Sequence, residues 1–202
     1  MEIKAEFKLE ELGLLSEISR DLLNGKLSDF AKLFNASEVD AECSKIDFGK
    51  EKREILIQTV QNQYESCGLK APSMLQSLKS DNTFTITTGH QLCLFTGPFY
   101  LVSKIASIIK AAEELNNQEG DKQFVPVFWM ATEDHDFEEI RELHLFNKSV
   151  IWNTDQSGAV GRMKTNGLES CLSELKELTR NSELALGIQT DSKNYAGHFR
   201  KL

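Results

Sequence analysis

The first eighty residues carry apolar side chains at helical spacing. The pattern predicts one helix over residues 12–23 and a second short helix over 30–34. A third helix is predicted over residues 50–67, with Gly68 as its C-cap. Pro72 then opens a last helical turn. The chain therefore begins with a helical segment.

Between residues 83 and 130 the pattern changes to strand, helix and strand. Residues 83–88 are β-branched and alternating, 99–115 repeat apolar side chains every three or four positions, and 124–130 form an apolar run. This order predicts an α/β fold with two adjacent parallel strands joined by a right-handed crossover. Pro126 cannot donate a hydrogen bond to a sheet, so it is expected in an edge strand or at a bulge.

The remaining residues predict a hairpin followed by mostly polar helices. The hairpin strands are expected at 143–146 and 150–153, with the turn at 147–149, and Trp129 and Trp152 are expected in the core. Two strands and a hairpin do not complete a sheet of ordinary size, so we expect the N-terminal part of a longer, truncated enzyme. The expected organisation is a helical segment that packs on the core (1–82), part of an α/β core (83–153) and the start of a mostly helical connecting segment (154–202).

Composition narrows the classes of protein. The chain has 202 residues, 40% of them hydrophobic, which is ample for a packed core. A net charge of -8 argues against a nucleic-acid binder and against adhesion to an anionic membrane. No apolar stretch approaches the roughly 20 residues that cross a bilayer, and the charged N-terminus lacks a signal-peptide core. Four cysteines without a Cys-x-x-Cys pair fit a reducing cytosol.

The loop after the first predicted strand is a candidate ligand site. Ligands of open parallel sheets bind beyond the carboxyl ends of the strands. Gly89 and Gly97 let the backbone approach a ligand closely, and His90 and Gln91 can donate hydrogen bonds to phosphate or carboxylate oxygens; Thr96 lies in the same loop. The alternative is that the glycines only shape a turn. Cys93, which has apolar neighbours, is expected to be a small buried side chain rather than a nucleophile.

The loop after the second predicted strand gathers charge. Glu133, Asp134 and Asp136 surround His135, so two carboxylates can bind Mg²⁺ or orient an amine while the imidazole acts as a base. The alternative for Asp136 is structural, since Glu139 three residues later resembles a capping box. A catalytic zinc site is not favoured, because no His-x-x-x-His or cysteine ligand set accompanies the cluster.

Two segments resemble a known family. TTGHQLCLFTGPFYLVSKI and VPVFWMATEDHDFEEI closely resemble the bacillithiol-biosynthesis cysteine-adding enzymes, a family of cysteine ligases. The resemblance implies a Rossmann-like parallel sheet core related to class I nucleotidyltransferases and aminoacyl-tRNA synthetases. It also implies a protein more than twice this length, with a C-terminal coiled coil that forms a homodimer. His90 stands where the related synthetases carry a phosphate-binding histidine motif, which here reads Gly-His-Gln.

The reaction implied by the resemblance joins cysteine through an amide to the amino group of glucosaminyl malate, the last step of bacillithiol synthesis. A carboxylate does not condense with an amine in water without activation, so we expect ATP as cosubstrate, with Mg²⁺ as a possible companion. The expected catalytic residues are His90, Asp134 and His135; the expected binding residues are Gly89, Gln91, Thr96, Gly97, Glu133 and Asp136. The alternative is a Rossmann-like module that binds a nucleotide or sugar acid without chemistry.

Overall fold

A computed structural model of the chain describes residues 13–28, 38–118, 120–188 and 192–202. Contacts divide the chain into two units, Met1–Asp47 and Phe48–Leu202. The described part of the first unit contains α1 (Glu17–Leu23) and α2 (Val39–Cys43). The predicted helix over 12–23 is shorter than expected, because Ser16 caps its N-terminus by accepting a hydrogen bond from the Ser19 N–H. The helix predicted over 30–34 lies outside the described residues.

The second unit begins with α3 (Lys50–Ser66), as the sequence predicts. Its C-terminus confirms the predicted cap: Gly68 has a φ of +72°, and its N–H donates to the carbonyl of Glu65. The N–H of Leu69 reaches back to the carbonyl of Tyr64, which completes a Schellman motif. After Pro72 the predicted helical turn is a 3₁₀ helix, η3 (Ser73–Lys79).

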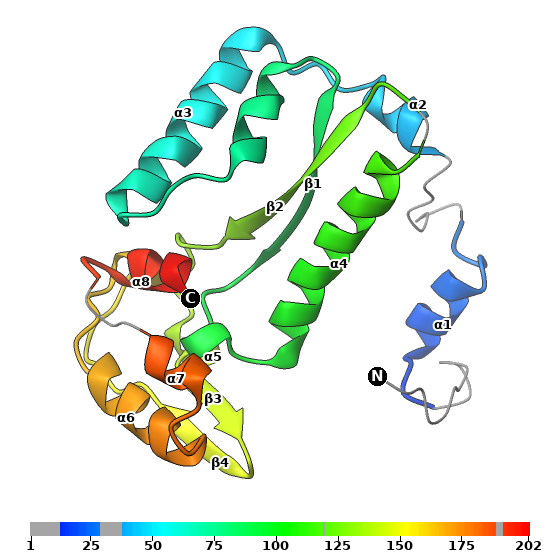
Figure 1. Ribbon diagram of the computed structural model, residues 1–202. Helices are drawn as coiled ribbons and strands as arrows, with labels where there is room; N and C mark the ends of the chain where they lie inside the picture. The colour runs from blue at the N-terminus through cyan, green and yellow to red at the C-terminus, as the bar shows by residue number, and fades with distance from the viewer. Residues whose placement is uncertain (1–12, 29–37, 119, 189–191) are drawn as a thin grey trace. The chain divides into compact units, whose positions relative to one another are not determined.

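The βαβ unit is confirmed. Strands β1 (Thr83–His90) and β2 (Gln123–Met130) pair in parallel, and α4 (Phe99–Asn116) joins them (Figure 1). Among the described strands β2 has only β1 as a neighbour, so Pro126 lies in an edge strand, where its missing N–H is tolerated.

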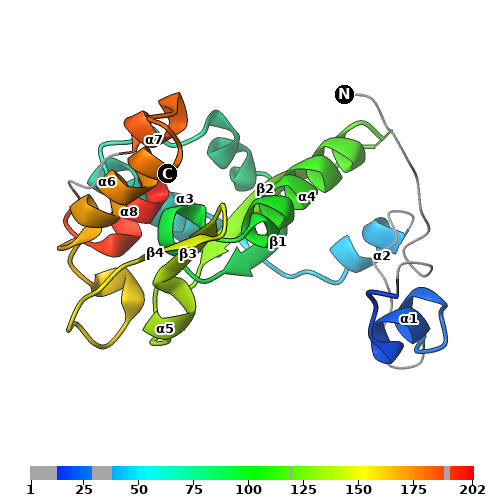
Figure 2. The same ribbon diagram turned by 90° about the horizontal axis from the view of Figure 1, so that it is seen from below.

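Helices cover both faces of the two strands. Val125 and Val127 of β2 pack with Ile57 of α3 and with the leucines of η3. The opposite face carries α4, which runs along both strands and buries Leu101, Ala112 and Leu115 (Figures 1 and 2). Alternation along each strand explains the division, since successive side chains point to opposite faces.

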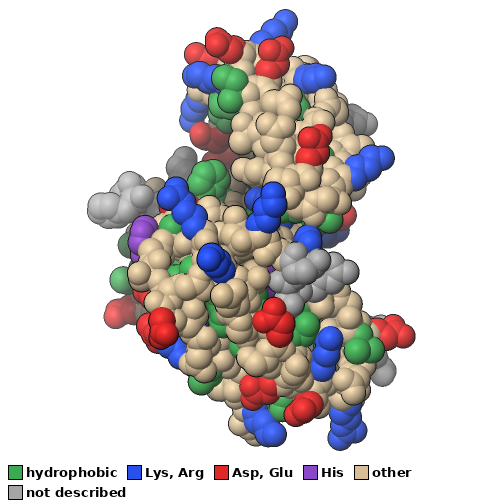
Figure 3. All heavy atoms as spheres, turned by 90° about the vertical axis from the view of Figure 1, so that its left-hand side faces the viewer, with side chains coloured by type: hydrophobic (Ala, Val, Ile, Leu, Met, Phe, Trp, Pro, Cys, Tyr) green, Lys and Arg blue, Asp and Glu red, His purple; other side chains and the backbone are tan. Residues whose placement is uncertain are grey.

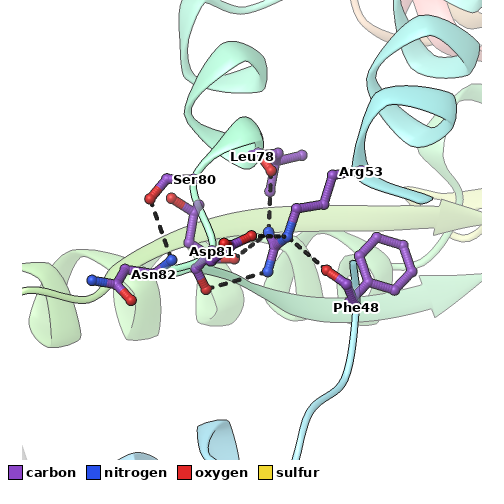
Figure 4. Close-up of polar contacts among 7 residues, drawn as sticks. Phe48, Arg53, Leu78, Ser80, Asp81 and Asn82 are labelled. Atoms are coloured by element: carbon purple, nitrogen blue, oxygen red, sulfur yellow. Dashed lines mark hydrogen bonds and ion pairs between the residues drawn. The ribbon is translucent and has the colours of Figure 1, made fainter. Parts of the chain in front are cut away.

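A buried arginine ties α3 to the start of β1. Arg53, 5% exposed, donates to the backbone carbonyls of Phe48, Leu78 and Thr83 at 2.8–3.1 Å and to that of Asp81 at 3.3 Å (Figure 4). The planar guanidinium can meet several carbonyls at once because its N–H groups form a fixed fork. Carbonyls at the η3–β1 corner thus gain donors that no helix or strand supplies.

The larger hydrophobic core lies at the carboxyl ends of β1 and β2. It joins residues 92–95 and α4 to the elements that follow β2. Those elements are α5 (Phe137–Ile140), β3 (Glu142–Leu145), β4 (Lys148–Ile151), η5 (Val160–Arg162), α6 (Leu168–Leu178), α7 (Glu183–Gly187) and α8 (Tyr195–Lys201). Trp152 is fully buried at its centre, as predicted, against the rings of Phe137 and Tyr195.

Two details of this region differ from the prediction. The hairpin β3–β4 turns at Phe146 and Asn147, both with positive φ, rather than at 147–149. A two-residue turn of this kind matches the right-handed twist of the strands, which places the turn earlier than the sequence pattern indicated. Trp129 is 60% exposed instead of buried, since it faces away from α4 at the end of β2.

Charge is distributed without segregation on the face shown in Figure 3, where acidic, basic and hydrophobic side chains are interspersed. No helix among the described residues is both long and apolar enough to cross a membrane. The boundaries at residues 82 and 153 stay a prediction.

Candidate functional site

The two loops singled out in the sequence lie side by side. The parallel pairing of β1 with β2 ends with His90 opposite Met130. Just beyond that pair, the N–H of Ala131 donates to the carbonyl of His90 at 3.1 Å. One residue further on, the Gln91 side-chain amide donates to Asp134 Oδ2 at 2.9 Å. The same amide also bonds to the carboxylate of Glu139. The predicted proximity of the loops is therefore confirmed, and Gln91 is the side chain that joins them.

Asp134 organises the second loop. Its carboxylate accepts from Gln91 and from the backbone N–H groups of His135 at 2.7 Å and Asp136 at 3.3 Å. The hydrogen bond from Gln91, followed by those from the two N–H groups, lowers the pKa of Asp134. The side chain is thus held as an anion and its acceptor sites are largely used within the loop, so it is placed to position its neighbours.

Asp136 caps α5, as the structural alternative predicts. Its Oδ1 accepts from the N–H of Glu139 at 3.3 Å. The reciprocal half of a capping box is absent among the described contacts, because the N–H of Asp136 donates to Asp134 and Glu139 bonds to Gln91. The cap therefore fixes the loop to the start of a short helix.

His90 lies on the α4 side of the sheet, half-buried. Its Nδ1 is 3.1 Å from the carbonyl oxygen of Gln91 and 3.6 Å from Cys93 Sγ, and the ring meets Tyr100 edge-on. Lys104 of α4, which sequence reasoning did not single out, donates to the carbonyl of Gly89 at 3.2 Å and lies over the Tyr100 ring. Its signal in the sequence was a cation near the start of the apolar helix that follows the loop. The structure gathers an imidazole and an ammonium group at the end of β1.

The rest of the first loop is conformationally constrained. Phe95, Thr96 and Gly97 all have positive φ, at 47°, 69° and 53°. A Cβ on Gly97 would lie 2.3 Å from Cβ of Cys93, so only glycine fits this position. Cys93 is buried, as expected, and this burial raises the pKa of its thiol. Gly97 therefore shapes the turn, as the alternative interpretation predicts. Thr96 is half-buried and has a left-handed backbone conformation like its two neighbours.

A cavity of about 720 Å³ opens beside the second loop. The prediction that His90 and Gln91 line a pocket with Glu133 and Asp134 is not met by this cavity. Its lining residues are Glu133, His135, Asp155, Gln156, Ser157, Gly158, Ala159, Arg162 and Met163. Gln91 is turned instead toward Asp134 and Glu139, and residues 155–163 form the other wall.

The segment 155–163 lies against the second loop through its backbone. The N–H of Gly161 donates to the carbonyl of Thr132 at 3.0 Å, and that of Val160 to the carbonyl of Asp134 at 2.7 Å. A Cβ on Gly161 would lie 2.5 Å from Cβ of Thr132, so the close approach requires glycine. Asp155 and Arg162 enter the site in this way. In the sequence these two residues stand only in a polar stretch around Gly158 and in the Gly-Arg-Met sequence at residues 161–163.

In the part of the chain that the structure describes, no group of three His, Cys, Asp or Glu side chains could hold a metal ion. The site instead combines a cationic corner at the end of β1 with a mixed-charge cavity beside the loop after β2.

Comparison with known proteins agrees with this geometry. Residues 3–202 match the family described as "Bacillithiol biosynthesis BshC, N-terminal Rossmann-like domain". The chain belongs to the BshC family. Its Rossmann-like core is the β1–α4–β2 unit with the helices that cover it.

Relatives in this family carry the name "Putative cysteine ligase BshC". The relative from Cytophaga hutchinsonii is 45% identical over 128 residues, which cover 62% of this chain and 24% of the relative. The Flavobacterium psychrophilum relative is 42% identical over 147 residues, which cover 70% of this chain and 28% of the relative. The Flavobacterium johnsoniae relative is 39% identical over 168 residues, which cover 79% of this chain and 32% of the relative. The chain thus spans about a quarter to a third of the length of these BshC relatives.

Proposed function

We propose that the protein containing this chain is a ligase that joins the carboxyl group of cysteine to the amino group of glucosaminyl malate, forming an amide in the last step of bacillithiol synthesis. The observation that carries the proposal is membership of the BshC family, whose relatives are named as cysteine ligases. The site supports it, since two polar loops joined by Gln91 lie at the carboxyl ends of parallel strands, where such folds bind ligands.

Amide formation from a carboxylate needs activation, for which we propose ATP on a core related to class I nucleotidyltransferases. His90 and Lys104 would contact phosphate oxygens at the end of β1. The first turn of α4 adds to the attraction, because Pro98 provides no side-chain cap and the helix of 18 residues directs its positive end toward the loop. Gly89, Thr96 and Gly97 would shape the backbone around the nucleotide.

The second loop would handle the amine. Attack by the amino group on the activated cysteine carbonyl would displace the phosphate-bearing group derived from ATP and release a proton, which the exposed imidazole of His135 can accept. Glu133, which lines the same cavity, would contribute to substrate binding beside His135. Asp134, Asp136 and Gln91 would keep the loop in place through the hydrogen bonds described above.

Mg²⁺ would enter with the nucleotide. Magnesium commonly keeps one or two protein carboxylates together with substrate phosphates and waters, so a dedicated three-residue site is not required. We further propose that the whole protein acts as a homodimer in the cytoplasm, where the four free cysteines of this chain stay reduced.

The test uses full-length protein with cysteine, ATP and glucosaminyl malate. Product would be trapped by thiol alkylation and identified by mass spectrometry, with parallel reactions that omit each substrate. We expect the cysteinyl amide only when all three are present. Binding of ATP without any amide product, in protein shown to be folded, would favour the non-catalytic binding module instead.

A further inference from the structure

The cavity beside the second loop has an unusual charge pattern. Two carboxylates, Glu133 and Asp155, and one guanidinium, Arg162, line it together with the imidazole of His135. None of the three charged side chains forms a salt bridge with another described residue, so all remain available to a ligand. A cavity that offers both signs of charge suits a ligand that also carries both.

We propose that this cavity is the binding site for a free α-amino acid, with Arg162 contacting the α-carboxylate and Glu133 with Asp155 contacting the α-ammonium group. An arginine side chain can bind a carboxylate through two parallel hydrogen bonds. The inference rests on the proposed function, in which that amino acid is cysteine. It places the amino acid at the second loop, while the nucleotide phosphates are proposed at the adjoining first loop.

Charge balance distinguishes the amino acid from the other substrates. Two carboxylates against one guanidinium make the lining more acidic than basic, which repels a polyanion such as ATP and disfavours a dicarboxylate. A zwitterion has no net charge and meets a complementary partner at each end. The acidic wall is therefore an argument for the amino acid and against placing the triphosphate here.

The walls of the cavity are fixed in place. Besides the backbone bonds of Val160 and Gly161, the Gln156 side chain closes residues 156–164 into a loop. Its Oε1 accepts from the N–H of Lys164 at 2.7 Å, and its Nε2 donates to the carbonyl of Lys164 at 3.1 Å. The segment that carries Arg162 is therefore hydrogen-bonded to the second loop and also within itself. This lowers the entropy that is lost when a ligand binds.

The apolar part of the lining fits a small side chain. Met163, 4% exposed, belongs both to the cavity and to the main hydrophobic core. A thioether accepts apolar and sulfur-containing neighbours readily, so a thiol-bearing side chain can rest against it. The volume of about 720 Å³ exceeds that of an amino acid, so cysteine fits within the cavity.

The experiment measures binding to full-length protein by isothermal titration calorimetry, with and without a non-hydrolysable ATP analogue. The probes are L-cysteine, its methyl ester, 3-mercaptopropionate and L-malate. The variants are Arg162→Gln, the pair Glu133→Gln with Asp155→Asn, and Lys164→Gln as control. Lys164 carries the same charge two residues from Arg162 but does not line the cavity.

We expect Arg162→Gln to weaken L-cysteine binding at least about tenfold while leaving the ester unchanged, because only cysteine presents the carboxylate. The acidic pair should weaken cysteine and ester but not 3-mercaptopropionate. Lys164→Gln should bind all probes like the wild type, and circular dichroism should show every variant folded.

Wild-type affinity for cysteine in Arg162→Gln would overturn the assignment. So would L-malate that competes with cysteine in the wild type, or the absence of cysteine binding with and without the ATP analogue. Amide formation in the wild-type protein is measured alongside. If product forms but the cysteine KM is unchanged in Arg162→Gln, the cavity assignment fails and the ligase proposal stands; if no product forms, the ligase proposal itself fails.

Discussion

His90 is the last residue of β1, and one nitrogen of its ring is already hydrogen-bonded. Nδ1 faces the carbonyl oxygen of Gln91, which leaves Nε2 as the ring atom for a ligand. When the ring is cationic, both nitrogens donate, one to the loop and one outward. A side chain held in this way can donate to charge that develops on a phosphate or carboxylate without reorganising first.

In full-length protein we expect His90→Ala to lower kcat by about 10²–10³, with the cysteine KM nearly unchanged, as for other preorganised donors that act in the transition state. Steady-state kinetics and the melting temperature should be measured on one preparation. A purely structural His90 would give the reverse result, a lower melting temperature with normal kcat in the folded fraction.

Gly97 is constrained from two directions. Its φ of +53° disfavours any Cβ, and the atom that such a Cβ would meet, Cβ of Cys93, is buried in the main core. We expect Gly97→Ala to lower the free energy of unfolding by about 2–5 kcal/mol, from backbone strain and overpacking together. Urea denaturation measures the change.

Gly120→Ala is the matched control, since nothing lies within 4 Å of the position its Cβ would take. Equal effects of the two substitutions would mean that the loop rearranges freely around Cys93. Such an outcome would remove the argument that the first loop has a single allowed shape.

Among the elements, α3 is joined by the hydrogen bonds of one side chain to the strand that follows it. Arg53 supplies donors to carbonyls just before α3, in η3 and in β1 (Figure 4). A buried carbonyl that loses its partner costs about 1–3 kcal/mol. The single guanidinium therefore stabilises a junction of three elements.

We expect Arg53→Met to lower the free energy of unfolding by about 3 kcal/mol or more, because methionine keeps the apolar volume but donates no hydrogen bond. Arg53→Lys should fall between, since one ammonium group cannot match the planar fork. Chemical denaturation is the measurement, and Arg180→Met, at an exposed position, is the control. A loss no larger than the control's would show that water satisfies these carbonyls.

Element types were largely predictable from sequence, while their ends were not. The apolar period of α4 and the β-branched residues of β1 identify both elements, because burial of one face dictates the spacing. The start of α1 and the turn of the hairpin depend instead on local hydrogen bonds and positive φ values at Ser16, Phe146 and Asn147. Trp129 was misplaced since a large ring usually indicates burial, but which face of β2 is covered depends on the packing of other elements.

At the scale of the whole molecule, α4 is apolar on two sides. One side packs on the strands, and the other presents Phe99, Val102 and Ile109 to solvent, with Phe99 81% exposed. Their spacing places them along one stripe of the helix. Exposed apolar stripes of this kind favour association.

We expect the 202-residue chain to associate in a concentration-dependent way, and Val102→Gln with Ile109→Gln to reduce that association, since glutamine keeps helix propensity while removing apolar surface. Sedimentation velocity at several concentrations measures it. Leu101→Gln, on the packed face, should instead unfold the chain. A wild-type chain that stays monomeric throughout would contradict the prediction.

The two loops that directly follow β1 and β2 were predictable from the sequence, whereas the rest of the candidate site was not. Both loops were located from the strands alone, because parallel strands end at a common edge. The cavity depends on residues 155–163, which have no apolar period and reach the second loop only through backbone bonds and the missing side chain of Gly161. A contact of this kind leaves no pattern in a single sequence.

The parallel pairing of β1 with β2 also has a consequence for synthesis on the ribosome. Every pair in the ladder joins residues about 40 positions apart, from Thr83 with Gln123 to His90 with Met130. At translation rates of about 5–20 residues per second, β1 emerges about 2–8 seconds before its partner. The threonines that alternate along β1 make this waiting strand less apolar than β2, which reduces the risk of mispairing while the nascent chain is incomplete.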